Sequence, residues 1–198
     1  GEEQLALVYN ATLTLLYRLL FLLYAESRDL LPVAEIGGYY EKSLTALKDE
    51  IAAAAHTAEG QRDERLIADY SADPAQTHLW MRLIDLFAVI GDGRSELNVP
   101  KYNGGLFLTH LDEAVEDHER ELAEFLSTHA LSDQYLARAI DRLARDPDEK
   151  THGLVMIDFK SLGVRQLGSI YEGLLEFKVR IAQEKMAVCS EKSREVIL

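Results

Sequence analysis

The residues from Leu5 to Ala25 constrain the fold most, because they form an apolar run about as long as the roughly 20 residues that a membrane-spanning helix requires. Arg18 lies inside this run, where a bilayer centre would penalise it by about 2.5–3.5 kcal/mol. The flanks carry Glu2, Glu3 and Glu26 and no basic anchor. We therefore predict the buried central helix of a globular domain and no membrane association.

This predicted helix has two different sides. At 100° per residue its leucines cover one side, and a polar and aromatic stripe lies opposite. Aromatic residues and arginine are enriched in docking surfaces, but the simpler interpretation is a solvent-facing side with amphipathic side chains lying along it. We adopt the simpler interpretation. The stripe consists of Asn10, Thr14, Tyr17, Phe21, Tyr24 and Arg28.

The middle of the chain predicts further amphipathic helices. Apolar residues at spacings of three and four indicate a helix from about Leu44 to near Gly60. Asp73-Pro74 is typical of an N-cap followed by a first-turn proline, for a helix that ends at Gly91-Asp92-Gly93. Three more helices are predicted: a charged one through Leu122 and Leu126, one capped by Ser132 and ended by Asp146-Pro147-Asp148, and one over Val164 to Leu175.

The pattern changes after Leu175, where apolar and polar residues alternate and predict two or three antiparallel strands. A ribbon of this size is only marginally stable in isolation. The chain also begins with Gly1 and not with Met. We therefore expect a domain cut from a larger protein with a β-containing neighbour. The predicted fold class is mainly α, an irregular helical bundle with a small C-terminal antiparallel β-ribbon. We place the helical domain at 1–175 and the ribbon at 176–198.

Charge and cysteine content restrict the function. Asp and Glu number 34 against 21 Lys and Arg, a formal net charge of −13. This balance disfavours a free-standing nucleic-acid binder, because such binding depends on clustered cations that release counterions from phosphates. Cys189 is the only cysteine, which excludes an internal disulfide and a cysteine-based zinc site. Without a signal-peptide pattern, we expect a cytoplasmic location.

One short motif has the residue types of a nuclease site. Pro147-Asp148 followed by Asp158-Phe159-Lys160 matches the PD-(D/E)-x-K pattern, in which two carboxylates hold magnesium and a lysine orients the attacking water. Such a site needs a mixed sheet around it, whereas the chain before it has helical periodicity. The simpler interpretation is a turn that ends a helix, followed by a surface lysine.

A second group has the composition of a metal site but not its spacing. Its members are His110, Glu113, Asp117 and His118. The two histidines are eight residues apart and would lie about 80° apart around a helix, so we predict no metal site. The chain also has no recognisable nucleophile and base pair and no glycine-rich phosphate loop, so we predict no catalytic residue.

Four segments resemble a known family: LLYRLLFLLYAESRDLLP (15–32), VPKYNGGLF (99–107), LSDQYLARAIDRLAR (131–145) and DFKSLGVRQLGSIYEGLLEFKVRIA (158–182). They are similar to the helical region of type IIG restriction-modification enzymes and related phage-defence DNA adenine methyltransferases. The resemblance implies a non-catalytic spacer that orients the nuclease and methyltransferase parts. S-adenosylmethionine and magnesium would be cofactors of the parent protein, and its neighbouring domains and double-stranded DNA would be the partners.

The Asn-Pro-Pro-Tyr motif of that family, which holds a flipped base, is absent, because none of the four prolines is adjacent to another. The residues expected to contact DNA or a neighbouring domain are Lys101, Tyr102, Asn103 and Arg165. Two alternatives stay open. One is a stand-alone magnesium nuclease that uses Asp148, Asp158 and Lys160. The other is a helical protein-interaction module independent of DNA, which the negative charge favours.

Overall fold

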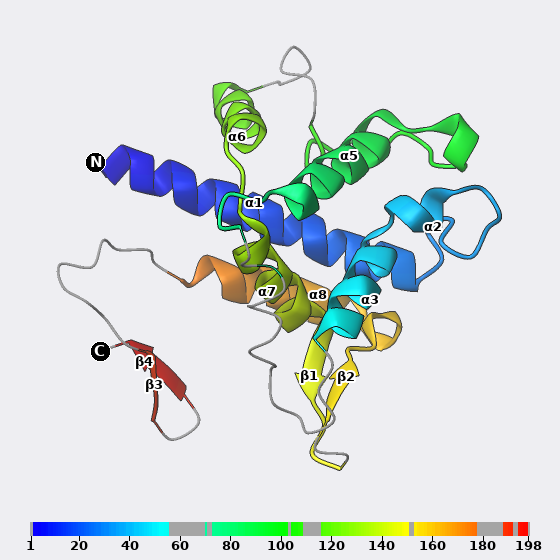
Figure 1. The fold of residues 1–198 in the computed structure, drawn as a ribbon. Helices are drawn as coiled ribbons and strands as arrows, with labels where there is room; N and C mark the ends of the chain where they lie inside the picture. The colour runs from blue at the N-terminus through cyan, green and yellow to red at the C-terminus, as the bar shows by residue number, and fades with distance from the viewer. Residues whose placement is uncertain are drawn as a thin grey trace.

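The structure is a computed structural model that describes residues 2–55, 70, 73–102, 104–108, 116–150, 153–177, 188–191 and 194–197. In these ranges the chain is mainly helical with small antiparallel ribbons, which confirms the predicted fold class (Figure 1). The α-helices are α1 (Glu2–Ser27), α2 (Tyr39–Lys42), α3 (Leu44–Ala54), α5 (His78–Asp92), α6 (Asp117–Thr128), α7 (Asp133–Ala144) and α8 (Val164–Leu175). Two short 3₁₀ turns are η1 (Ser95–Leu97) and η3 (Phe159–Ser161).

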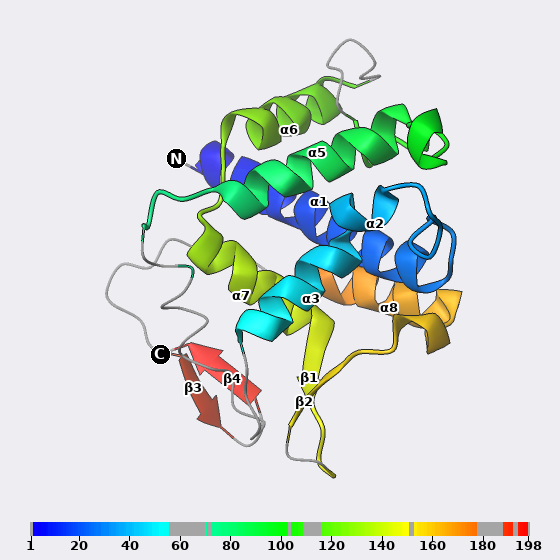
Figure 2. The same cartoon turned by 45° about the vertical axis from the view of Figure 1, so that its right-hand side comes forward.

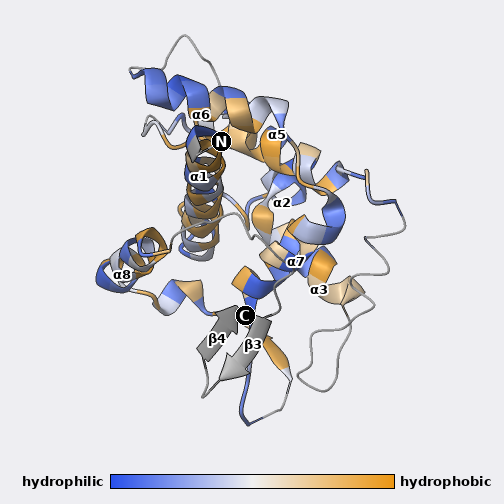
Figure 3. Ribbon diagram, turned by 90° about the vertical axis from the view of Figure 1, so that its left-hand side faces the viewer, coloured by the Kyte–Doolittle hydropathy of each residue, from blue (hydrophilic) through white to orange (hydrophobic). Residues whose placement is uncertain are grey.

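α1 is the central helix of the domain, as predicted. It contacts α3, α6, α8 and η3, while α7 packs against α3 and α5 (Figures 1 and 2). Hydrophobic positions run along α1 and α5, and α6 is more hydrophilic (Figure 3). In the described part of the chain, α1 is also the one helix long and apolar enough to cross a membrane, with 39% of its apolar window buried. Arg18 and Glu26 are buried on α1 with hydrogen-bond partners from other segments, which is typical of a core helix.

The start of α5 differs from the prediction. Asp73-Pro74 forms a separate turn, in which Asp73 Oδ1 accepts a hydrogen bond from the Ala75 amide at 2.9 Å, and the helix begins only at His78. The cap comes from another segment: Asp133, at the start of α7, accepts from the amides of His78 at 3.2 Å and Leu79 at 2.9 Å. A carboxylate 55 residues away in sequence therefore satisfies the first N–H groups of α5.

Asp133→Ala is expected to lower the free energy of unfolding by about 1–2 kcal/mol, because two amides of α5 lose their acceptor. Urea denaturation of the purified chain measures this loss. Ser132→Ala is the matched control, since Ser132 occupies the N-cap position of α7 but its side chain makes no capping hydrogen bond. Its expected change is within about 0.5 kcal/mol. Equal losses in the two variants would contradict the tertiary cap.

Two antiparallel ribbons complete the described chain. β3 (Val188–Glu191) pairs with β4 (Arg194–Ile197), which confirms the ribbon predicted at the C-terminus. β1 (Arg145–Pro147) pairs with β2 (Leu154–Met156), with Arg145 opposite Met156. This ribbon was not predicted as a pair, and its first strand contains Asp146 and Pro147, which were predicted as the end of a helix. Of the alternating segment after Leu175 that predicts strands, residues 178–187 lie outside the described residues.

Candidate functional site

Part of the polar and aromatic stripe of α1 is covered by α8, so the solvent-facing interpretation of that stripe is wrong at Tyr17. The rings of Tyr17 and Tyr171 meet edge to face with centroids 4.7 Å apart, and the Tyr17 hydroxyl donates to the Tyr171 carbonyl at 3.4 Å. Tyr9 donates to the Leu174 carbonyl at 3.5 Å. At Tyr17 the stripe is thus an internal docking surface, a role that suits aromatic residues with polar tips.

These contacts also set the direction of α8. Its start lies beside the end of α1, where Arg28 Nη2 donates to the Leu162 carbonyl at 3.0 Å. Its end lies beside Tyr9, near the start of α1. α8 therefore runs antiparallel to α1, and the beginning of α1 and the end of α8 lie at the same end of the domain (Figure 1).

The loop after α5 contains three of the four residues expected to contact DNA. Tyr102 is half-buried: its hydroxyl donates to the Leu30 carbonyl at 3.0 Å, and its ring meets Phe21 edge to face at 5.9 Å. Burial raises the pKa of Tyr102. Lys101 is exposed, and Asn103 lies outside the described residues. The loop is therefore anchored to α1 by Tyr102 and presents Lys101 to solvent.

Arg165 lies in the first turn of α8 and is exposed. It belongs to an element packed on the stripe of α1, whereas the loop of Lys101 follows α5. The structure therefore presents these two cations to solvent from different elements of the domain.

The residues of the nuclease alternative take part in ordinary structural contacts. Asp158 Oδ1 accepts from the amides of Lys160 at 3.0 Å and Ser161 at 3.3 Å, so Asp158 caps η3. Lys160 Nζ bonds to Asp29 Oδ2 at 3.2 Å. In the described ranges, β2 belongs to a sheet of two strands and not to the mixed sheet that such a site requires. Asp148 lies after β1, where its amide donates to the Gly153 carbonyl.

The group of His110, Glu113, Asp117 and His118, for which no metal site was predicted, is only partly described. Asp117 and His118 are exposed in the first turn of α6, while His110 and Glu113 lie outside the described residues. The described residues contain no group of three His, Cys, Asp or Glu side chains placed to hold a metal ion.

The sequence analysis used Arg18 only as an argument against a membrane-spanning helix and did not predict that its side chain is buried in the core. Its side chain is 5% exposed, and Nε donates to the Leu106 carbonyl at 2.7 Å. The guanidinium carbon lies 5.0 Å from the centroid of the Phe87 ring and 5.8 Å from that of Phe107. Burial lowers the pKa of Arg18 to about 10. The available signal was a lone cation inside an apolar run.

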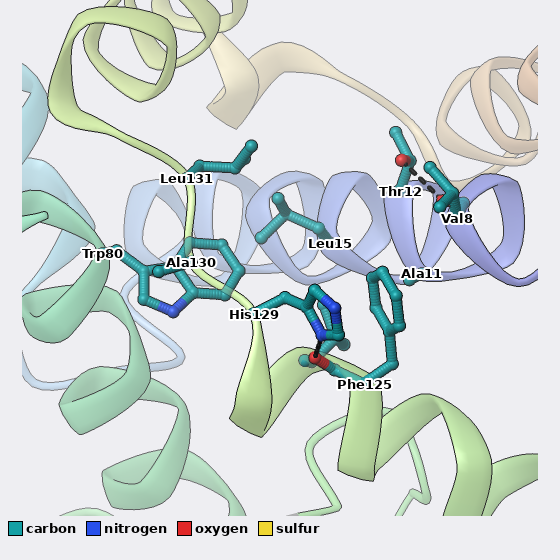
Figure 4. A pocket seen from close by; sticks show the side chains of 10 residues that line it. Val8, Ala11, Thr12, Leu15, Trp80, Phe125, His129, Ala130 and Leu131 are labelled. Carbon is teal, nitrogen blue, oxygen red and sulfur yellow. Dashed lines mark hydrogen bonds between the residues drawn. The ribbon is translucent and has the colours of Figure 1, made fainter. Parts of the chain in front are cut away.

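An apolar groove of about 240 Å³ lies between α1, the start of α5 and the end of α6 (Figure 4). Trp80, Leu15 and Phe125 line it, and the His129 ring stacks on Phe125 with centroids 4.0 Å apart. The His129 Nδ1 lies 3.1 Å from the Phe125 carbonyl oxygen. The groove offers an apolar surface with few polar groups, which suits an apolar side chain from another segment.

Comparison with known proteins identifies no relative: no family model, curated protein or solved structure matches this chain.

Proposed function

We propose that this chain is a helical connector domain of a DNA restriction-modification methyltransferase, which orients the nuclease and methyltransferase parts without catalysing a reaction itself. Two things support the proposal: the resemblance of four sequence segments to that family, and the return of α8 along α1. The return of α8 along α1 supports the orienting role of the domain. Segments attached before α1 and after α8 would leave from the same end of a rigid block and lie side by side. A flexible linker of similar length would not set their orientation.

Because of its negative net charge, such a domain would leave most of the DNA binding to its neighbouring domains. At −13, it supplies few of the cations that displace counterions from phosphates. Lys101 and Arg165 are exposed and remain the proposed backbone contacts. S-adenosylmethionine and magnesium would bind to the neighbouring parts of the parent protein.

The test uses the complete product of the gene that encodes this chain and measures transfer of labelled methyl groups from S-adenosylmethionine to adenine in double-stranded DNA. Tyr171→Ala removes the ring that packs on Tyr17 and loosens α8 from α1. We expect methyl transfer to slow about tenfold or more, because small misplacements of reacting groups have large kinetic effects. The control is Tyr135→Ala, which removes a tyrosine that is 60% exposed on α7 and should leave the rate unchanged.

Two results would overturn the connector role: no methyl transfer by the complete product, or no change of rate in Tyr171→Ala when hydrogen exchange shows that α8 has loosened. Magnesium-dependent DNA cleavage by the isolated chain, abolished by Lys160→Ala, would instead establish the nuclease alternative.

The apolar groove favours a second candidate, a protein-interaction module independent of DNA. Its apolar lining and the exposed Val8 and Leu131 at its edge form the kind of surface that docks an apolar anchor of a partner. The same assay separates the two: a DNA-independent module predicts no methyl transfer and no salt-dependent DNA affinity in the complete product.

A further inference from the structure

The guanidinium of Arg18 is buried without a carboxylate partner among the described residues. None of the ion pairs in the described ranges involves it. Its acceptors are two neutral carbonyl oxygens, of Leu106 at 2.7 Å and of Leu108 at 3.5 Å, and its guanidinium carbon lies over two phenylalanine rings. Carbonyls and rings ease the burial of a cation but do not neutralise it. A buried charge of this kind is costly unless something compensates it.

The same side chain lines an open pocket of about 300 Å³ between α1, the turn at Gly104-Gly105 and α6. Arginine has five N–H donors, and the two carbonyls engage two of them, which leaves three. At a pKa of about 10 the group stays protonated at neutral pH. The guanidinium fork matches the geometry of a carboxylate or a phosphate, and the pocket that Arg18 lines has room for such a group.

We propose that this pocket binds a small oxyanion, a phosphate or a carboxylate group, through the guanidinium of Arg18. The inference is independent of the connector role, because it rests on the burial and partners of one side chain. The bound anion would pair with the guanidinium of Arg18, which forms no ion pair with a carboxylate of the described residues, and it would exchange with solvent through the open side of the pocket.

The negative charge of Glu119 would repel an anion in this pocket, and removing that charge provides a second test of the proposal. Glu119 lines the pocket, and its Oε1 would lie 3.4 Å from a Cβ built on Gly105, while its Oε2 accepts from the Glu116 amide at 3.4 Å in the capping box of α6. Glutamine at position 119 preserves that capping box and removes the negative charge. Glu119→Gln should therefore strengthen oxyanion binding while α6 stays intact.

The experiment measures thermal unfolding of the complete chain with inorganic phosphate or with acetate, each raised to about 10 mM at an ionic strength held constant with sodium chloride. We expect a saturable rise in Tm of about 2–4 °C in the wild type. The rise should vanish in Arg18→Met, which keeps an unbranched but shorter side chain and removes the charged guanidinium, and should saturate at about two- to fivefold lower concentration in Glu119→Gln.

Ala123→Leu tests the pocket independently if Arg18→Met does not fold. The larger side chain fills the pocket from α6 and leaves Arg18 in place. It should also abolish the rise in Tm. A rise with phosphate alone or acetate alone supports the proposal and identifies which group the pocket takes, and a rise with both supports it as stated. The proposal is overturned if neither anion stabilises the wild type, or if all variants gain equally, since general exclusion of phosphate from protein surfaces acts on every variant.

Discussion

Glu26→Ala is expected to lower the free energy of unfolding by about 3–5 kcal/mol, the largest effect that we predict for a single side chain in this protein. The Glu26 carboxylate is 4% exposed and accepts four hydrogen bonds. Its Oε1 accepts from the Tyr39 hydroxyl and the Leu44 amide, both at 2.9 Å, and its Oε2 accepts from the amide and the hydroxyl of Thr45, both at 2.7 Å. Burial raises the pKa of Glu26, and these hydrogen bonds oppose that shift.

The size of the effect follows from what the variant leaves behind. Leu44 and Thr45 form the first turn of α3, so Glu26 joins the end of α1 to the start of α3 and places a negative charge at a helix N-terminus. Without it, buried donors lose their acceptor, and each costs about 1–3 kcal/mol. Calorimetry or urea denaturation measures the loss. Glu41→Ala, which removes an exposed glutamate of α2, should change stability by less than about 0.5 kcal/mol. A loss below about 1 kcal/mol in Glu26→Ala would contradict this role.

Gly91→Ala is expected to destabilise the protein by about 1–3 kcal/mol, although the same change within a helix ordinarily stabilises by about 0.5–1 kcal/mol. Gly91 is buried in the last turn of α5, and a Cβ there would collide with the carbonyl oxygen of Phe107. This contact is with backbone, so no change of rotamer can relieve it. The loop must move instead.

That movement would spread into the surroundings of Arg18. The Phe107 ring packs against Phe21 at 5.3 Å and Phe87 at 5.8 Å, and the preceding carbonyl, of Leu106, accepts the hydrogen bond from Arg18. Chemical denaturation of the purified variant gives the change in stability.

Gly168→Ala is the matched control for Gly91→Ala. Gly168 lies inside α8, and a Cβ there meets nothing within 4 Å, so the ordinary gain of about 0.5–1 kcal/mol is expected. The two glycine variants should thus change stability in opposite directions. A gain in both would show that the loop yields to Gly91→Ala without cost.

The positions of most elements could be predicted from the sequence, because periodicity is a local property of the chain. The predicted helix over Val164 to Leu175 has the bounds of α8, the apolar run near the N-terminus forms α1, and the C-terminal ribbon is present. The candidate site could be predicted less well. The sequence pointed to the loop around Lys101 and Tyr102, whereas the buried cation with a pocket beside it is Arg18.

Tertiary structure alone decided which groups satisfy the buried polar atoms. Glu26 meets Leu44 across 18 residues, Asp133 meets His78 across 55, and Arg18 meets Leu106 across 88. It also decided that α8 packs on Tyr17 of the α1 stripe. Side-chain spacing along a chain determines which face of a helix is apolar, because that depends on a repeat of 3.6 residues. It carries no information on which distant segment will lie against that face, since that depends on how all the helices pack together.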